Sequence, residues 1–403
     1  MNNVSNNRIY YSLFIIIFFG TFTDVNTQLL YFKFEETSIY KFFFNFYIYL
    51  SLYFLPLKNL NKLDNFFEKK VKFLYLLLLA YGLIIIFTSI NSLSSIVNIF
   101  GNPTFGPIFF TIFFLLWGTQ INCLFLFNKL CLLSVYAALV ITFLSMIFGF
   151  DPAINLFLPL FYLIITLNYQ ITSSKILIFI SIFVSIYIFY TLGYRIGLVM
   201  LGFSSLILLV SLFKNKTLFY FFILFFVLSP IILFILFINY EFNLFEFMTN
   251  LFAQESALSL DTRSFIYLEF FNQLNTKELI FGKGVLGTYY SNYFYLYRDV
   301  GGDHFDRVGV EIGFLHYILK GGAIYFIIYY LFLGFICLKR YKSNYFSSIA
   351  MFISIFLSLL FVENQSFFSV KIILIWILVS FCASKLFNSL TDEEIKKKIT
   401  NLN

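Results

Sequence analysis

Long apolar runs fill most of this 403-residue chain, each extending over about 15 to 25 residues without alternating between apolar and polar positions. Only 12% of the residues are charged, whereas a soluble domain carries about 25%. Because so little polar surface remains to hold the chain in water, we expect the bilayer to be its solvent. In lipid, backbone amides must be paired internally, and runs that do not alternate form helices rather than barrel strands. The sequence therefore predicts an all-α, polytopic integral membrane protein.

The apolar runs predict about twelve transmembrane helices. Their expected ranges are 9–23, 38–57, 73–90, 107–127, 130–148, 154–168, 176–192, 197–213, 218–239, 311–338, 346–361 and 368–386. The first run lacks a small-residue cleavage site and is expected to be a span rather than a removed signal. These spans predict four parts, which are the transmembrane residues 1–239, a large polar loop 240–310, the transmembrane residues 311–386 and a solvated tail 387–403.

Basic residues predict the orientation, because lysine and arginine in short loops stay on the cytoplasmic side. With a cytoplasmic N-terminus, 17 of the 27 basic residues fall on that side. They are Arg8, Lys58, Lys62, Lys69, Lys70, Lys72, Lys129, Lys175, Lys214, Lys216, Lys339, Arg340, Lys342, Lys385, Lys396, Lys397 and Lys398. This arrangement predicts cytoplasmic N- and C-termini and an external 240–310 loop. The net charge of +7 is then mainly a topology signal, and the dispersed basic residues predict no nucleic-acid partner.

Two arginines are candidate anion ligands at the outer boundary. Arg195 lies in the tight turn between the spans 176–192 and 197–213, where it either reaches lipid headgroups or binds phosphate through its forked guanidinium. Asp261 is a candidate cap for an amphipathic helix over residues 261–274, with Arg263 in the first turn. Arg263 then faces either a cavity or solvent.

The large loop also contains glycines, acids and a histidine. Gly282, Gly284 and Gly287 allow tight turns and a close approach to a ligand, but the spacing is not that of a P-loop. The segment from Arg298 to Arg307 holds His304, which is either a general base or a surface histidine. Two histidines and scattered cysteines predict no metal site.

Several charged residues stand at or within the later spans. Glu311 opens the span 311–338 and either pairs with an external arginine or activates a hydroxyl. Lys320 falls inside that span and must find a partner or reach the surface. Glu363 and Lys371 are expected to form a pair or to face one cavity. The loop tyrosines either stack on sugar rings or form an interfacial aromatic belt, which we favour. They are Tyr289, Tyr290, Tyr293, Tyr295 and Tyr297.

In its architecture, and more closely over residues 194–338, the chain resembles the integral membrane family of O-antigen polymerases and O-antigen ligases. Three motifs carry the resemblance. The first is the arginine that opens a span in Tyr-Arg195-Ile-Gly-Leu, and the second is Arg263 followed by the glycine segment that ends at Gly287. The third, Glu311-Ile-Gly-Phe-Leu-His-Tyr-Ile-Leu-Lys-Gly-Gly322, is similar to the family's His-Asn-x-Tyr-Leu…Gly motif. The ligases carry histidine where this chain has Glu311, and this difference favours a polymerase.

The resemblance implies a C-type glycosyltransferase-like fold in the bacterial inner membrane. It implies a metal-independent enzyme without a cofactor, which moves the growing glycan from undecaprenyl pyrophosphate to an incoming lipid-linked repeat unit at the periplasmic face. Fixed positive charge must then stabilise the departing pyrophosphate, and Arg195, Arg263 and Arg307 are the candidates. Glu311, His304 or the substrate itself takes the proton.

The same resemblance implies partners and leaves alternatives open. The expected partners are the lipid-linked oligosaccharide, membrane lipids and a chain-length regulator protein. Gly282, Gly284 and Gly287 are expected to support the loop. An O-antigen ligase is the nearest alternative, and a polysaccharide flippase is the non-enzymatic one. A flippase should carry its polar residues at the bilayer midplane, whereas here they concentrate in one loop.

Overall fold

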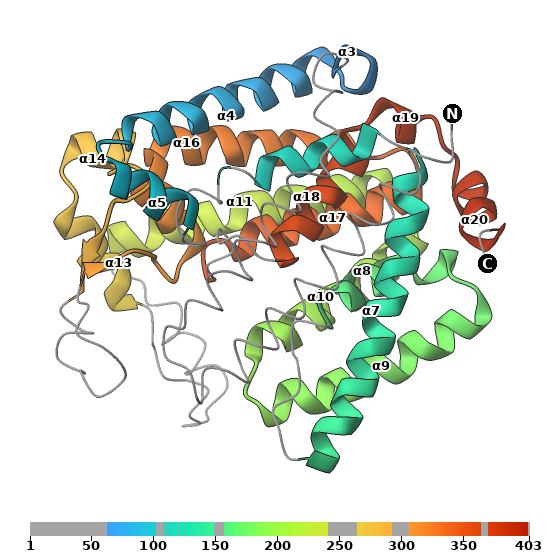
Figure 1. Ribbon diagram of the computed structural model, residues 1–403. Coiled ribbons are helices and arrows are strands. Elements are labelled where there is room, and N and C mark those ends of the chain that lie inside the picture. Colours follow the sequence, from blue (N-terminus) through green and yellow to red (C-terminus); the bar gives the residue numbers. More distant parts are fainter. Residues whose placement is uncertain are drawn as a thin grey trace.

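The computed structural model describes residues 63–101, 109, 111–119, 121–148, 157–240, 264–291, 306–363 and 370–401. The described chain is mainly helical, in agreement with the all-α prediction, and adds one short β-ribbon (Figure 1). The spans expected at 9–23 and 38–57 lie outside the described residues.

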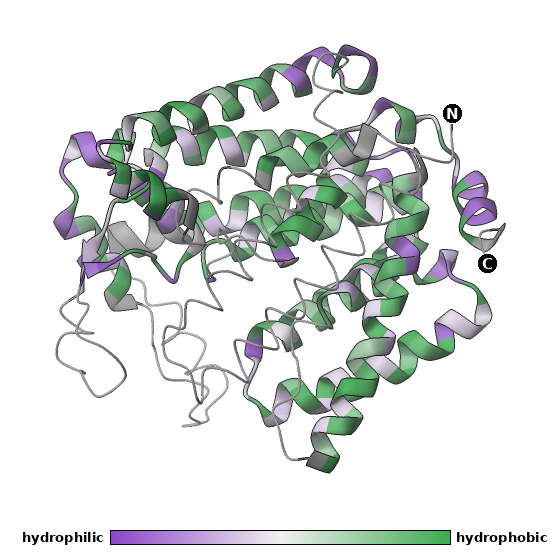
Figure 2. Ribbon diagram, in the orientation of Figure 1, coloured by the Kyte–Doolittle hydropathy of each residue, from purple (hydrophilic) through white to green (hydrophobic). Residues whose placement is uncertain are grey.

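Among the residues that the structure describes, five helices are long and apolar enough to cross a membrane. They are α4 (Lys69–Thr88), α7 (Ile121–Phe148), α9 (Thr172–Thr191), α10 (Arg195–Leu212) and α16 (Gly313–Leu338). Further apolar helices are α11 (Lys216–Tyr240), α17 (Asn344–Leu359) and α18 (Val370–Ala383). Figure 2 shows the hydrophobic colour running along these helices. The described part of the chain is therefore mainly helical, with several helices whose length and composition suit a membrane protein.

Three of the expected spans, 107–127, 130–148 and 154–168, take a different form. A loop is expected at residues 128–129, between the spans 107–127 and 130–148. The chain instead forms the 3₁₀-helix η2 (Thr111–Thr119) and then α7, which continues through Lys129. Asn128 is buried and exchanges two hydrogen bonds of 3.1 and 2.7 Å with Gln170, so this polar residue is satisfied within a helix. The range 154–168 contains only α8 (Leu158–Ile165) and η4 (Leu167–Tyr169). At 1.5 Å per residue, the 8 residues of α8 are too few to cross a bilayer.

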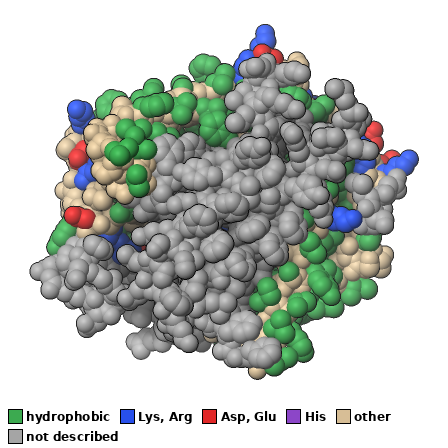
Figure 3. Space-filling model, viewed as in Figure 1, with side chains coloured by type: hydrophobic (Ala, Val, Ile, Leu, Met, Phe, Trp, Pro, Cys, Tyr) green, Lys and Arg blue, Asp and Glu red, His purple; other side chains and the backbone are tan. Residues whose placement is uncertain are grey.

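The helices α16 and α17 form the centre of the bundle. α16 packs against α4, α17 and α18, while α17 also contacts α10 and α11. Aromatic side chains fill the contacts, with Phe314 and Phe361 stacked at 4.4 Å between ring centroids and Tyr317 and Tyr329 at 4.6 Å. Large apolar side chains such as Phe73 and Phe183 are exposed, as expected for surfaces that face lipid. Figure 3 shows such hydrophobic side chains on the described surface, with charged side chains toward its edges.

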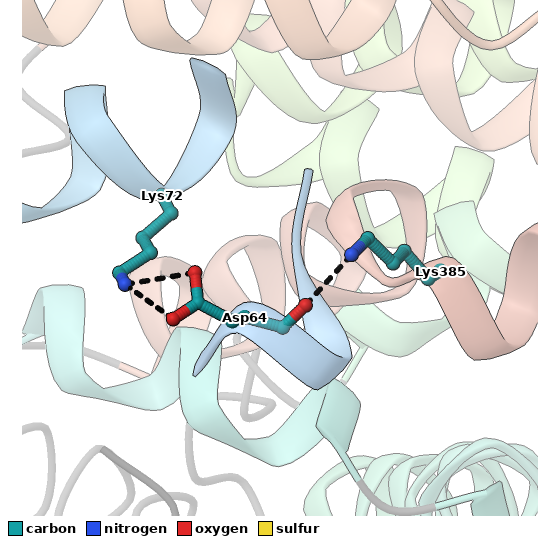
Figure 4. Close-up of polar contacts among 3 residues, drawn as sticks. All are labelled: Asp64, Lys72 and Lys385. Atoms are coloured by element: carbon teal, nitrogen blue, oxygen red, sulfur yellow. Dashed lines mark hydrogen bonds and ion pairs between the residues drawn. The ribbon is translucent and has the colours of Figure 1, made fainter. Parts of the chain in front are cut away.

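Basic segments from distant parts of the sequence contact one another at one end of the bundle. The carboxylate of Asp64 in α3 (Leu63–Phe66) accepts hydrogen bonds of 2.8 Å from Lys72, and its carbonyl accepts one of 2.7 Å from Lys385 in α19 (Lys385–Asn388) (Figure 4). Lys339 is paired with Glu68. We call this end, which carries α3, α19 and α20 (Asp392–Asn401), the basic end. Its lysines, including Lys72, Lys339 and Lys385, are among the basic residues expected on the cytoplasmic side.

The C-terminal tail does not behave as the solvated end expected over 387–403. Within its described part, α20 buries Ile395 and Ile399. Asp392 accepts hydrogen bonds from the hydroxyl of Tyr169 at 2.9 Å and from two backbone amides at the start of α17. The prediction of a free tail is therefore wrong, because a carboxylate and two apolar side chains attach α20 to the bundle.

Candidate functional site

A polar layer covers the end of the bundle opposite the basic end and is visible at the left of Figure 1. It contains α13 (Ser264–Gln273), α14 (Thr276–Phe281), the strands β1 (Tyr289–Tyr290) and β2 (Asp306–Arg307), and the residues that lead into α16. The short helix α5 (Leu93–Gly101) lies nearby in the view. We use the name polar layer for residues 264–291 and 306–312.

The helix α13 agrees with the amphipathic helix expected over 261–274. Ile266 and Phe270 are buried, whereas Leu268 is 62% exposed. The next helix, α14, begins with a reciprocal capping box in which Asn275 and Glu278 each accept a hydrogen bond from the other's backbone amide, at 2.9 and 3.0 Å. The predicted cap Asp261 and Arg263 lie outside the described residues.

The glycine segment packs against a break in α16. Gly322 has φ 74° and ψ 174°, which interrupts the helix, and the amide of Lys283 donates a hydrogen bond of 2.7 Å to the carbonyl of Leu319 beside this break. A Cβ on Gly282 would lie 2.7 Å from the backbone of Lys320 and Gly322. The close approach that Gly282 allows is thus to the backbone of a helix.

The same segment is fastened at two further points. The amide of Val285 donates a hydrogen bond of 2.9 Å to the hydroxyl of Ser89 at the end of α4, and a Cβ on Gly284 would lie 2.6 Å from that oxygen. Lys320 is only 1% exposed, and its ammonium donates a hydrogen bond of 2.8 Å to the carbonyl of Gly287. Lys320 therefore has a backbone partner inside the protein, and the loop-supporting positions Gly282, Gly284 and Gly287 all lie at this junction.

Arg307 contacts Tyr289 across the β-ribbon and Glu311 four residues further along the chain. Arg307 lies directly opposite Tyr289 in the antiparallel register, and its guanidinium Nη2 is 3.1 Å from Glu311 Oε1. The side chains of Arg307 and Glu311 are 28% and 39% exposed, so both remain accessible. This pair lies at the entrance to α16, where the polar layer meets the apolar helices.

Tyr289 was expected in an aromatic belt but is only 1% exposed. Burial raises the pKa of its hydroxyl, while the charge of Arg307 lowers this pKa and the charges of Glu311 and Glu269 raise it. The belt prediction is therefore wrong for Tyr289, whereas Tyr290 is 37% exposed. Tyr293, Tyr295 and Tyr297 lie outside the described residues. The pairing of β1 with β2, which joins strands separated by a long loop and places Tyr289 opposite Arg307, is not predicted from the sequence.

His316 lies just inside α16 below this pair. It is fully buried, and its Nδ1 accepts a hydrogen bond of 3.2 Å from the amide of Val310. This bond fixes the ring against the segment that carries Arg307 and Glu311. His304, the histidine predicted as a base, lies outside the described residues.

Arg195 is the first residue of α10, outside the polar layer, and its side chain is exposed. Its neighbour Tyr194 is half-buried, and burial together with the charge of Glu363 raises the pKa of the Tyr194 hydroxyl. Glu363 is paired with Lys371 at 2.9 Å, as predicted, and its carbonyl accepts a hydrogen bond of 3.1 Å from Gly313 at the start of α16. The start of α10 therefore lies at the same end of the bundle as the polar layer.

The described part of this site offers a guanidinium, a carboxylate and a phenol at the boundary of the apolar helices. Such a set can bind an anion and accept a proton. Among the described residues, no group of three His, Cys, Asp or Glu side chains is arranged to hold a metal ion. Comparison of the chain with protein-family models, with curated proteins and with solved structures finds no match.

Proposed function

We propose that the chain is a repeat-unit polymerase of the O-antigen type, a metal-independent glycosyltransferase with about twelve spans in the bacterial inner membrane. In this proposal the basic end is cytoplasmic, as are both termini, and the polar layer is periplasmic. The substrate is a glycan on undecaprenyl pyrophosphate, and the acceptor is an incoming lipid-linked repeat unit. A chain-length regulator protein is a proposed partner.

The observation that carries the proposal is the pair formed by Arg307 and Glu311 at the entrance to α16. A substrate anchored by a lipid holds its diphosphate at the edge of the bilayer, so its enzyme needs cationic groups at that depth. The guanidinium of Arg307 is partly exposed, and its planar fork of donors matches the geometry of phosphate oxygens. Arg195 and Arg263 complete the proposed set of cations.

The proposed reaction is a substitution at the anomeric carbon of the growing chain. A hydroxyl of the incoming unit attacks that carbon, and the bond from the carbon to the diphosphate oxygen breaks. The departing undecaprenyl pyrophosphate takes the electron pair, and the arginines stabilise its charge. The hydroxyl proton passes to Glu311 or His304, which act as candidate bases.

The test is to replace Arg195, Arg263 and Arg307 singly by alanine in cells that make the glycan. Loss of long chains with single repeat units still attached to the lipid core supports the polymerase. The control is Lys277→Ala, since Lys277 is an exposed cation of the same layer and should not be needed. Loss of every unit from the core would indicate a ligase instead.

The break in α16 favours a second candidate, a polysaccharide flippase. Transporters use discontinuous membrane helices at their substrate sites, and here the break at Gly322 lies beside the buried Lys320. The same experiment separates the two functions, because loss of a flippase traps lipid-linked units on the cytoplasmic side. We favour the polymerase because Lys320 is already bonded to Gly287 and helps to attach the polar layer.

A further inference from the structure

The hydroxyl of Tyr289 is a buried polar group that the described protein leaves without a hydrogen-bond partner. The side chain is 1% exposed, and its ring packs against Phe270 at 6.2 Å between centroids. A buried hydroxyl without a partner destabilises a protein, whereas phenylalanine would keep the same packing without that cost. A bound ligand can supply the hydrogen-bond partner that the described residues do not provide for this oxygen.

The surroundings of Tyr289 indicate what that partner is. Residues directly opposite in an antiparallel pair project to the same face, so Tyr289 and Arg307 share one face of the ribbon. Arg307 also holds Glu311 at 3.1 Å, while Glu269 is occupied by the hydroxyl of Ser291 at 2.6 Å. A phenol and a guanidinium on one face form a pair of donors, which suits an anionic oxygen.

We propose that Tyr289 is a further substrate-binding residue of this site, whose hydroxyl donates a hydrogen bond to a diphosphate oxygen that Arg307 also binds. This inference rests on the proposed function and adds a neutral donor to its set of cations. Binding of the diphosphate satisfies the phenol, so the hydroxyl that destabilises the empty site strengthens the occupied one.

The test uses the purified full chain in lipid nanodiscs and follows thermal unfolding with increasing undecaprenyl pyrophosphate. Without the probe, Tyr289→Phe should unfold at the same temperature as the unsubstituted protein or higher, because the lost hydroxyl had no partner. Tyr289→Phe should need about a tenfold higher concentration of undecaprenyl pyrophosphate to reach the same stabilisation. This is the size of effect expected from losing one hydrogen bond to a charged group. The matched control is Tyr290→Phe, which changes the exposed neighbour on the other face of the strand and should match the unsubstituted protein.

A second probe, undecaprenol, has the same lipid without phosphate. Undecaprenol should stabilise Tyr289→Phe and the unsubstituted protein equally. If Tyr289→Phe weakened the stabilisation by both probes to the same extent, a contact with the diphosphate would be overturned. A lower unfolding temperature of Tyr289→Phe without probe would assign the hydroxyl a structural role and overturn the inference. Identical responses to undecaprenyl pyrophosphate would overturn it while leaving the proposed function intact. If the unsubstituted protein does not respond to this probe, the proposed function falls and the inference with it.

Discussion

Gly322 lies in direct backbone contact with Ile280, so that a Cβ at Gly322 would be 2.1 Å from the carbonyl oxygen of Ile280. Gly322 interrupts α16, and Ile280 belongs to α14 in the polar layer. The break in the membrane helix is therefore also the place where the polar layer is attached. Because the φ of 74° and ψ of 174° at Gly322 are essentially restricted to glycine, both the break and the attachment depend on this residue.

Replacing Gly322 by alanine should strongly destabilise the protein. The strained backbone and the clash with Ile280 together should cost roughly 2 to 5 kcal/mol, which thermal unfolding in detergent would measure as a lower midpoint. Gly202→Ala is the matched control, because a Cβ at this helical position meets no atom within 4 Å. Its stability should be unchanged or higher by up to about 1 kcal/mol. Equal midpoints for the two variants would contradict the proposed contact.

The helices were predictable because their signals are local. Apolar runs gave α9, α10 and α16 to within a few residues, and the periodicity of residues 261–274 gave α13. The ion pair of Glu363 with Lys371 also followed from two charges that flank one turn.

The contacts that build the candidate site were not predictable in the same way. No local pattern near Asn128 identifies Gln170 as its partner, so the polar pair Asn128 and Lys129 predicts a loop where the structure has α7. The register that places Tyr289 opposite Arg307 joins strands separated by a long loop, and no local pattern encodes it. Arg263 and His304 lie outside the described residues, so their roles stay predictions.

Arg307→Ala should separate stability from activity. Both partners of the pair with Glu311 are partly exposed, and such pairs contribute about 0 to 1 kcal/mol to folding. The unfolding midpoint should therefore move little while long glycan chains disappear, as measured by thermal unfolding and by gel analysis of the glycan. Arg307→Lys keeps the charge but loses the fork and should retain partial activity. A large fall in the midpoint would assign Arg307 a structural role instead.

Glu68 should make the stability of the basic end depend on pH. Its hydrogen bond and ion pair with Lys339 hold the pKa of its carboxyl below the ordinary value of 4.5. A lowered folded-state pKa means that this stabilisation is complete above the unfolded pKa and is lost as pH falls through the folded pKa. Glu68→Gln should therefore lower the unfolding midpoint at neutral pH and reduce its fall below pH 4.5.

The effect of Glu68 should be small, because its side chain is 43% exposed and solvent screens the pair. Raising the salt concentration should reduce the difference between Glu68→Gln and the unsubstituted protein. Lys339→Met removes the other partner and should reduce the acid dependence in the same way. An unchanged acid dependence in Glu68→Gln would show that the pair does not contribute.

Asp392→Ala should release α20 from the bundle. The carboxylate accepts hydrogen bonds from the Tyr169 hydroxyl at 2.9 Å and from the amides of Asn344 and Tyr345 at 3.0 and 3.2 Å, at the positive end of α17. Because these donors lose a charged acceptor, the loss should be about 1.5 to 3 kcal/mol, and hydrogen exchange over residues 391–401 should become faster. Glu393→Ala is the matched control, since Glu393 is the exposed neighbour in the same first turn. Equal exchange rates in the two variants would mean that the buried Ile395 and Ile399 hold the helix without Asp392.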